Sequence, residues 1–93
     1  MRVLAPEDRL SRTKDLLSTE LDQETVLMSI DVGAYYGLAG AARSIWAKLE
    51  NPTSFSALID CLETEYSVSR ATCESDVRKF LAELELEGLL RVE

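Results

Sequence analysis

The sequence predicts an α+β domain in which three short strands precede three helices. Apolar and polar residues alternate over 26–38, which is typical of strands, whereas from residue 39 onward apolar residues recur at helical three- and four-residue spacing. The length of 93 residues suits one hydrophobic core rather than two. This order of elements is that of a small mixed domain, with the sheet followed by the helices.

The first half of the chain is expected to form an antiparallel meander. Residues 1–14 show little periodicity and contain a proline, so we expect them to be a flexible N-terminal arm, with the domain spanning residues 15–93. Residues 15–21 are interpreted as the first strand, followed by a turn at Asp22-Gln23.

The next two strands should form a hairpin. In the second strand, 26–31, Val26, Met28 and Ile30 share one face. Val32-Gly33 is expected to connect it to the third strand, 34–38, because glycine takes a positive φ at little cost.

Three helices should follow the strands. The predicted ranges are 39–49, 55–66 and 70–87. Thr53 or Ser54 is a suitable N-cap for the second helix, and Gly88 should end the third. Residues 89–92 are expected to be a short closing strand or an apolar tail packed on the core.

Composition argues against several function classes. The net charge is −7, and residues 15–93 carry fifteen acidic against six basic side chains, so the domain should repel the phosphates of nucleic acids. No apolar run is long enough to span a bilayer, and the N-terminus does not look like a secretory signal, so we expect a cytoplasmic protein without membrane contact.

Catalytic chemistry has little support in the sequence. There is no histidine, zinc-ligand spacing or glycine-rich phosphate loop. Cys61 and Cys73 lie on or near apolar stripes, where a buried structural thiol is more common than a nucleophile. We therefore expect no enzyme, no cofactor and no metal site.

The residue pattern resembles that of PqqD-like proteins over residues 15–93. The resemblance begins with Tyr-Tyr-Gly-Leu at 35–38 and Ile45-Trp46, continues through Phe-Ser-Ala-Leu-Ile at 55–59, and ends with the apolar pattern of 73–90. Many members carry Asn and Thr after the strand, whereas this chain has alanine and glycine at 39–41, which removes a capping side chain.

The resemblance implies a RiPP recognition element, a winged-helix-like domain that binds the leader segment of a ribosomally made precursor peptide. It implies no catalysis by the domain itself. The partner would be a separate processing enzyme, and we favour the transglutaminase-like cysteine protease of a lasso-peptide pathway. The alternatives are a chaperone for a radical peptide-modifying enzyme, a winged-helix DNA-binding protein, or a module that dimerises through its strand edge.

In this family the leader adds as a strand to the third strand and lies against the third helix. The resemblance therefore implies a peptide-binding site made of Ala34, Tyr35, Tyr36, Gly37, Leu38, Cys73, Asp76, Val77, Phe80, Leu81 and Leu84. Helical spacing alone favours the core for Leu38, Leu81 and Leu84. Tyr35, Val77 and Phe80 fit a groove and a core equally well. Asp76 and Glu83 could form an acidic rim for a basic leader residue, or could be ordinary solvated charges.

Overall fold

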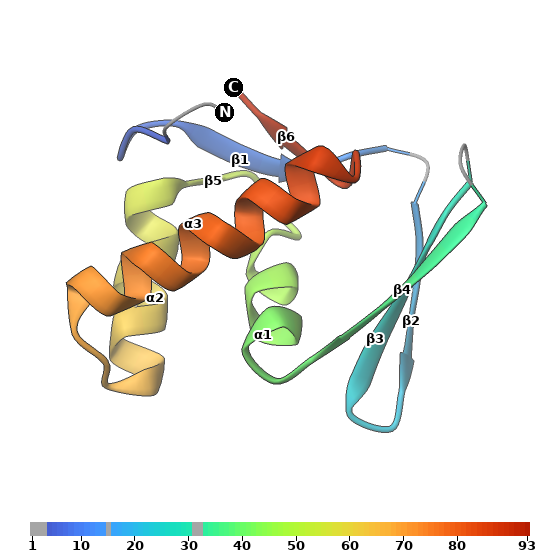
Figure 1. The fold of residues 1–93 in the computed structure, drawn as a ribbon, viewed down its shortest axis with the longest axis horizontal. Coiled ribbons are helices and arrows are strands. Elements are labelled where there is room, and N and C mark those ends of the chain that lie inside the picture. The colour runs from blue at the N-terminus through green and yellow to red at the C-terminus, as the bar shows by residue number, and fades with distance from the viewer. Residues whose placement is uncertain (1–3, 15, 31–32) are drawn as a thin grey trace.

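A computed structural model of the chain describes residues 4–14, 16–30 and 33–93. Three helices lie between a meander and a small second sheet (Figure 1). The elements in chain order are β1 (Arg9–Arg12), β2 (Leu16–Leu21), β3 (Glu24–Ser29), β4 (Ala34–Ala39), α1 (Gly40–Lys48), β5 (Thr53–Ser54), α2 (Phe55–Tyr66), α3 (Arg70–Leu86) and β6 (Leu90–Val92). The predicted α+β class with a meander and three helices is confirmed.

The meander has the strand order β2-β3-β4, and both pairings are antiparallel. The β2–β3 turn falls at the predicted Asp22, whose φ of 55° is in the left-handed region that Asp tolerates better than most residues. The predicted positions Asp15, Asp31 and Val32 lie outside the described residues. Gly33 has a φ of 73°, as its role in the hairpin requires.

One face of the meander packs on the helices, and the other is open to solvent. Thr25, Leu27 and Leu38 are buried on the inner face. On the outer face, by contrast, Leu17 and Tyr35 are largely exposed. The sheet is therefore covered on one side only. Val26 and Met28, which share the predicted apolar face, lie on the open side with Tyr35, because alternation shows which residues share a face but not which face the helices cover.

The expectation of a flexible arm over residues 1–14 is wrong for the segment that forms β1. Strand β1 is the middle strand of a second sheet, with β5 on one side and β6 on the other (Figure 1). Leu10 in this strand is completely buried, and Leu4, which precedes the strand, is nearly so. Local periodicity could not show this strand, because its partners come from residues 53–54 and 90–92, far along the chain. The pairing with β6 also decides that the last residues are a closing strand.

The helices form around buried apolar stripes and begin where suitable caps occur. The side chains of Ser54 and Ser69 accept hydrogen bonds from backbone N–H groups in the first turns of α2 and α3. Helix α1 has Ala39 as its N-cap and no side-chain cap, as the sequence indicated. Helix α3 ends at Leu86, one residue earlier than expected, and Gly88 follows with a φ of 77°.

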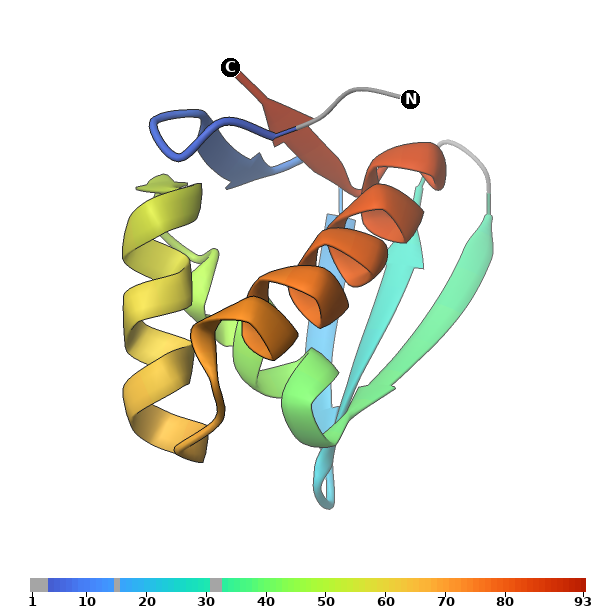
Figure 2. The ribbon, with the colours of Figure 1, turned by 60° about the vertical axis from the view of Figure 1, so that its left-hand side comes forward.

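Helix α1 lies between α2 and the meander, and α3 runs from the end of α2 toward the meander (Figures 1 and 2). The core beneath these elements is apolar. Its most completely buried large side chains are Trp46, Phe55, Leu10, Leu27, Leu49, Leu58, Ile59, Leu81 and Leu89. The arrangement leaves β4 at the edge of the meander, and its C-terminal end continues directly into α1.

Candidate peptide-binding site

Strand β4 has an unpaired edge. Within the described part of the chain it pairs with β3 on one side and with no strand on the other. Such an edge presents a row of backbone N–H and C=O groups that can pair with another extended chain. The edge is six residues long, which is enough to accept a short peptide strand.

Helix α3 lies alongside this strand. The hydroxyl of Tyr36, in the middle of β4, donates a hydrogen bond of 3.0 Å to Oε2 of Glu87, the C-cap of α3. This bond, with the nearby negative charge of Glu87, raises the pKa of the Tyr36 hydroxyl above its usual value. The contact joins β4 to the C-terminal end of the helix.

A mainly apolar pocket lies near the C-terminal end of β4, where the chain enters α1. Its volume is about 350 Å³. It is lined by Ala41, Ala42, Ile45, Leu62, Tyr66, Val68, Cys73, Asp76, Val77 and Phe80. Asp76 is the single ionisable carboxylate in this lining. The pocket is therefore suited to an apolar side chain whose neighbour in a peptide could meet a negative charge.

The structure separates the predicted site residues into groups. Residues 34–38 all lie in β4, and Cys73, Asp76, Val77 and Phe80 all line the pocket. The three expected core residues are indeed buried: Leu38, Leu81 and Leu84. Tyr35 is 72% exposed and belongs to the outer face of the meander, pointing away from the helices.

Burial now distinguishes Val77 from Phe80, which the sequence placed equally well in a groove or in the core. Val77 is 4% exposed and contributes to the core as well as to the pocket wall. Phe80 is half-buried and packs against the core from its edge. Phe80 is thus the larger accessible apolar surface on this side of α3.

Sequence reasoning missed the contribution of α1 and of the α2–α3 connection. Ala42 and Ile45 fall within the predicted helix at 39–49, but nothing in the sequence indicated that they also line a pocket. Tyr66 and Val68 are both more than a third exposed, which is unusual for large apolar side chains next to a helix end. The interrupted helical pattern at 67–69 was the available signal.

The thiols do not add a reactive centre to this site. Cys73 is buried, and desolvation raises the pKa of its thiol, with the negative charge of Glu63 acting in the same direction. Cys61 is exposed on α2, so the expected burial is confirmed for Cys73 and wrong for Cys61. The described residues contain no group of three potential metal ligands, and none of their helices is long and apolar enough to cross a membrane.

The fold and this site define a small domain with a free strand edge, a neighbouring helix and an apolar pocket. Residues 24–90 match the family model of coenzyme PQQ synthesis protein D, PqqD. The chain belongs to the PqqD family. No curated protein matches it.

Two solved structures have the same fold. TbiB1 in complex with the TbiA(β) leader peptide is 34% identical in sequence, and the match covers 87% of this chain and 94% of TbiB1 with a TM-score of 0.82. A lasso peptide synthetase B1 complexed with its leader peptide is 23% identical, covers 88% of this chain and 96% of that one, and has a TM-score of 0.78. The second likeness shows a shared fold.

Proposed function

We propose that this domain binds the leader segment of a ribosomally made precursor peptide and presents it to a separate processing enzyme. The observation that carries the proposal is the unpaired edge of β4, which has α3 beside it and an apolar pocket at its end. TbiB1, which shares the fold at 34% identity, forms a complex with a leader peptide. The domain itself needs no catalytic group, cofactor or metal for this role.

The energetics suit a flexible peptide. About four backbone hydrogen bonds along the edge would each contribute roughly 0.5–1.5 kcal/mol. An apolar side chain buried in the pocket would add about 1.5–3 kcal/mol. Ordering the peptide and losing its free translation oppose these gains. The apolar anchor therefore decides whether binding is weak or tight.

The pathway we favour is lasso-peptide biosynthesis. The two solved structures compared above are leader complexes, and one is named as a lasso peptide synthetase B1. In that setting the enzyme served would be a transglutaminase-like cysteine protease that removes the leader, and the encounter would occur in the cytoplasm. A chaperone role for a radical peptide-modifying enzyme is the alternative within the same family.

The contacts of α3 argue against the winged-helix DNA-binding alternative. The guanidinium of Arg78 donates to the backbone oxygen of Leu4 and lies 4.5 Å from the centre of the Phe55 ring. Arg70 is paired with carboxylates of α2. Two of the basic side chains of α3 are therefore engaged inside the molecule, and the helix has no basic face for a DNA groove.

The test is a titration of the purified protein with the leader of the precursor encoded beside its gene. Phe80→Ala should weaken binding roughly 10- to 100-fold, because it removes an apolar contact of about 1.5–3 kcal/mol. Fluorescence anisotropy with a labelled leader measures the effect. A second substitution in the groove, Val77→Asp, would not test binding, because Val77 is 4% exposed and a carboxylate there would destabilise the fold.

Leu21→Ala is the matched control, because Leu21 is 58% exposed on β2, at the opposite edge of the meander. It should bind the leader as the unaltered protein does. Circular dichroism of both variants should show the unaltered fold. The absence of saturable leader binding by the unaltered protein would contradict the proposed function, and normal binding by Phe80→Ala would contradict the placement of the groove.

A further inference from the structure

The side of α3 that faces the proposed groove carries a row of carboxylates. Asp76, Phe80, Glu83 and Glu87 follow one another at spacings of four, three and four, which places them on one face of the helix. Both ends of the row are located by contacts. Asp76 and Phe80 line the pocket, and Glu87 accepts the hydrogen bond from Tyr36 of β4. Glu83 lies between these two points.

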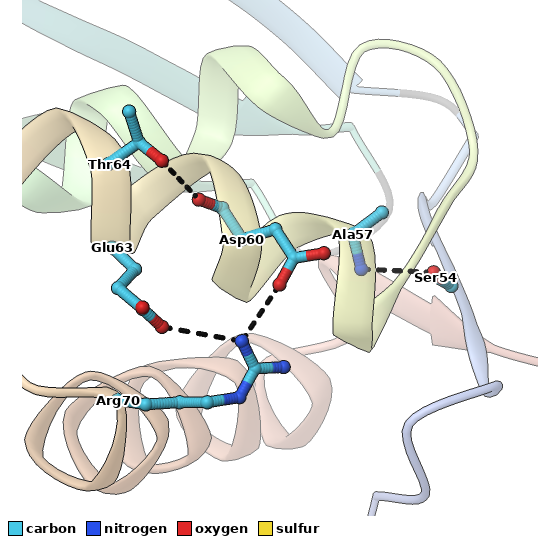
Figure 3. A network of polar contacts seen from close by, with 6 residues as sticks. All are labelled: Ser54, Ala57, Asp60, Glu63, Thr64 and Arg70. Atoms are coloured by element: carbon cyan, nitrogen blue, oxygen red, sulfur yellow. Dashed lines mark hydrogen bonds and ion pairs between the residues drawn. The ribbon is translucent and has the colours of Figure 1, made fainter.

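Elsewhere in the molecule, several carboxylates are paired with basic side chains, whereas others, such as Asp22, Glu24 and Glu74, are in none of the ion pairs between described residues. Glu20 pairs with Arg43 at 2.9 Å, and Glu65 pairs with Lys48. Figure 3 shows the third case, in which Arg70 of α3 reaches both Asp60, at 2.8 Å, and Glu63, at 3.3 Å, on α2. Basic side chains are few in this chain, and these three are used to neutralise specific acidic ones.

The row on α3 belongs to the unpaired carboxylates. Among the described residues, no basic side chain forms an ion pair with Asp76, Glu83 or Glu87. Lys79 is on a neighbouring part of the helix surface, but it pairs with none of the three. Three carboxylates on one helix face repel one another, and this repulsion grows when an apolar peptide displaces water from the groove. A bound peptide with positive charges opposite these carboxylates would relieve the repulsion.

The rise per residue of a helix and of a strand sets the spacing of the positive charges in such a peptide. Along α3, Phe80 and Glu87 are about 10 Å apart, because a helix rises about 1.5 Å per residue. An extended peptide covers that distance in about three residues, since a strand rises about 3.3 Å per residue. Alternate side chains of the strand face the same way, so positions two and four from the anchor are those that can face the helix.

We propose that the groove selects an extended peptide in which an apolar side chain enters the pocket and Lys or Arg follows two or four residues away, opposite Glu83 and Glu87. This inference rests on the proposed peptide-binding function and adds the chemistry of the ligand. The pocket supplies the apolar contact, and the row of carboxylates supplies the charge preference and the register.

The test is a selection from a random dodecapeptide library displayed on phage, with the full chain immobilised. We expect enriched peptides to share an apolar residue with Lys or Arg two or four positions away and to lack Asp and Glu there. Enriched peptides that carry no basic residue at those positions would overturn the charge inference but leave the proposed function intact. Failure to enrich any peptide would overturn both.

A charge reversal makes the test specific to the row. In a selected peptide, replacement of the basic residue by Glu should weaken its binding to the unaltered protein roughly three- to tenfold at low salt. Glu83→Lys should bind the Glu-substituted peptide better than the original one. Glu74→Lys is the matched control, because it changes the net charge equally on the opposite side of the same helix. An equal response of the two variants would show that the effect is one of overall charge and would overturn the proposal.

Discussion

Arg12 is the side chain that ties the N-terminal strand to the first helix. Its Nη2 donates a hydrogen bond to the backbone oxygen of Trp46, and its guanidinium lies 4.5 Å from the centre of the Trp46 ring. Desolvation lowers the pKa of Arg12, while the negative charge of Glu50 acts in the opposite direction. The sequence offered no reason to single out this residue, because its partner is 34 positions away.

We expect Arg12→Ala to lower the free energy of unfolding by about 1–3 kcal/mol, because it removes a stacking contact and a charged hydrogen bond. Urea denaturation followed by tryptophan fluorescence measures this loss. Arg9→Ala is the control, since Arg9 is exposed in the same strand, and it should change the free energy by less than about 0.5 kcal/mol. Equal effects of the two substitutions would contradict the role assigned to Arg12.

At the scale of elements, α3 has two functions in one apolar pattern. The stripe of Cys73, Val77, Leu81 and Leu84 is buried, whereas Phe80 stands at the edge of that stripe, half-buried. Helical spacing predicts the stripe but not which side of it is covered by the rest of the chain. That division is what separates residues needed for folding from those available to a peptide.

Strand β1 is an element of the fold rather than an appendage. We expect Leu10→Ala to destabilise the protein by about 2–5 kcal/mol, because a fully buried leucine is replaced and leaves a cavity. Chemical denaturation measures the change. Leu86→Ala, at an 85% exposed position of α3, should have little effect. A small loss for Leu10→Ala would support the flexible arm that the sequence indicated.

At the scale of the whole molecule, the acidic surface divides into a neutralised part and an unneutralised part. The ion pairs of Arg43, Lys48 and Arg70 connect β2 to α1, α1 to α2, and α2 to α3, respectively. They lie away from the carboxylate row of α3. The row on α3 is one of the acidic parts of the surface that these pairs leave unneutralised, and Asp22 and Glu24 at the β2–β3 turn are another.

The paired carboxylates also predict how stability depends on pH. A hydrogen bond from Thr25, aided by Arg43, lowers the pKa of Glu20, and a hydrogen bond from Lys48, aided by Ser44, lowers the pKa of Glu65. A group whose pKa is lower in the folded state contributes stability above its ordinary value of about 4.5 and loses it as the pH falls through the lowered pKa. Thermal melts should therefore show a falling melting temperature below about pH 4.5.

In the double variant Glu20→Gln with Glu65→Gln, this fall should be shallower than in the unaltered protein, since two of the titrating groups are gone. Melts of the two proteins at matched ionic strength make the comparison. Identical slopes would show that other carboxylates govern the acid sensitivity.

The sequence by itself determined the meander and the three helices, together with the cap of α2 and the glycine that follows α3. These follow from local periodicity and from short-range chemistry, such as the serine that begins α2. The resemblance to PqqD-like proteins added the expected ligand and the strand edge that would receive it.

Only the tertiary structure decided the second sheet and the boundary between core and groove. Strand β1 exists because residues 53–54 and 90–92 come to lie on either side of it, and such pairing leaves no local signal. Likewise, Phe80 and Leu81 are adjacent in sequence and equally apolar, yet one is half-buried at the pocket and the other is covered by the core. Burial depends on which segments meet in space, and periodicity along the chain reports only which residues share a face.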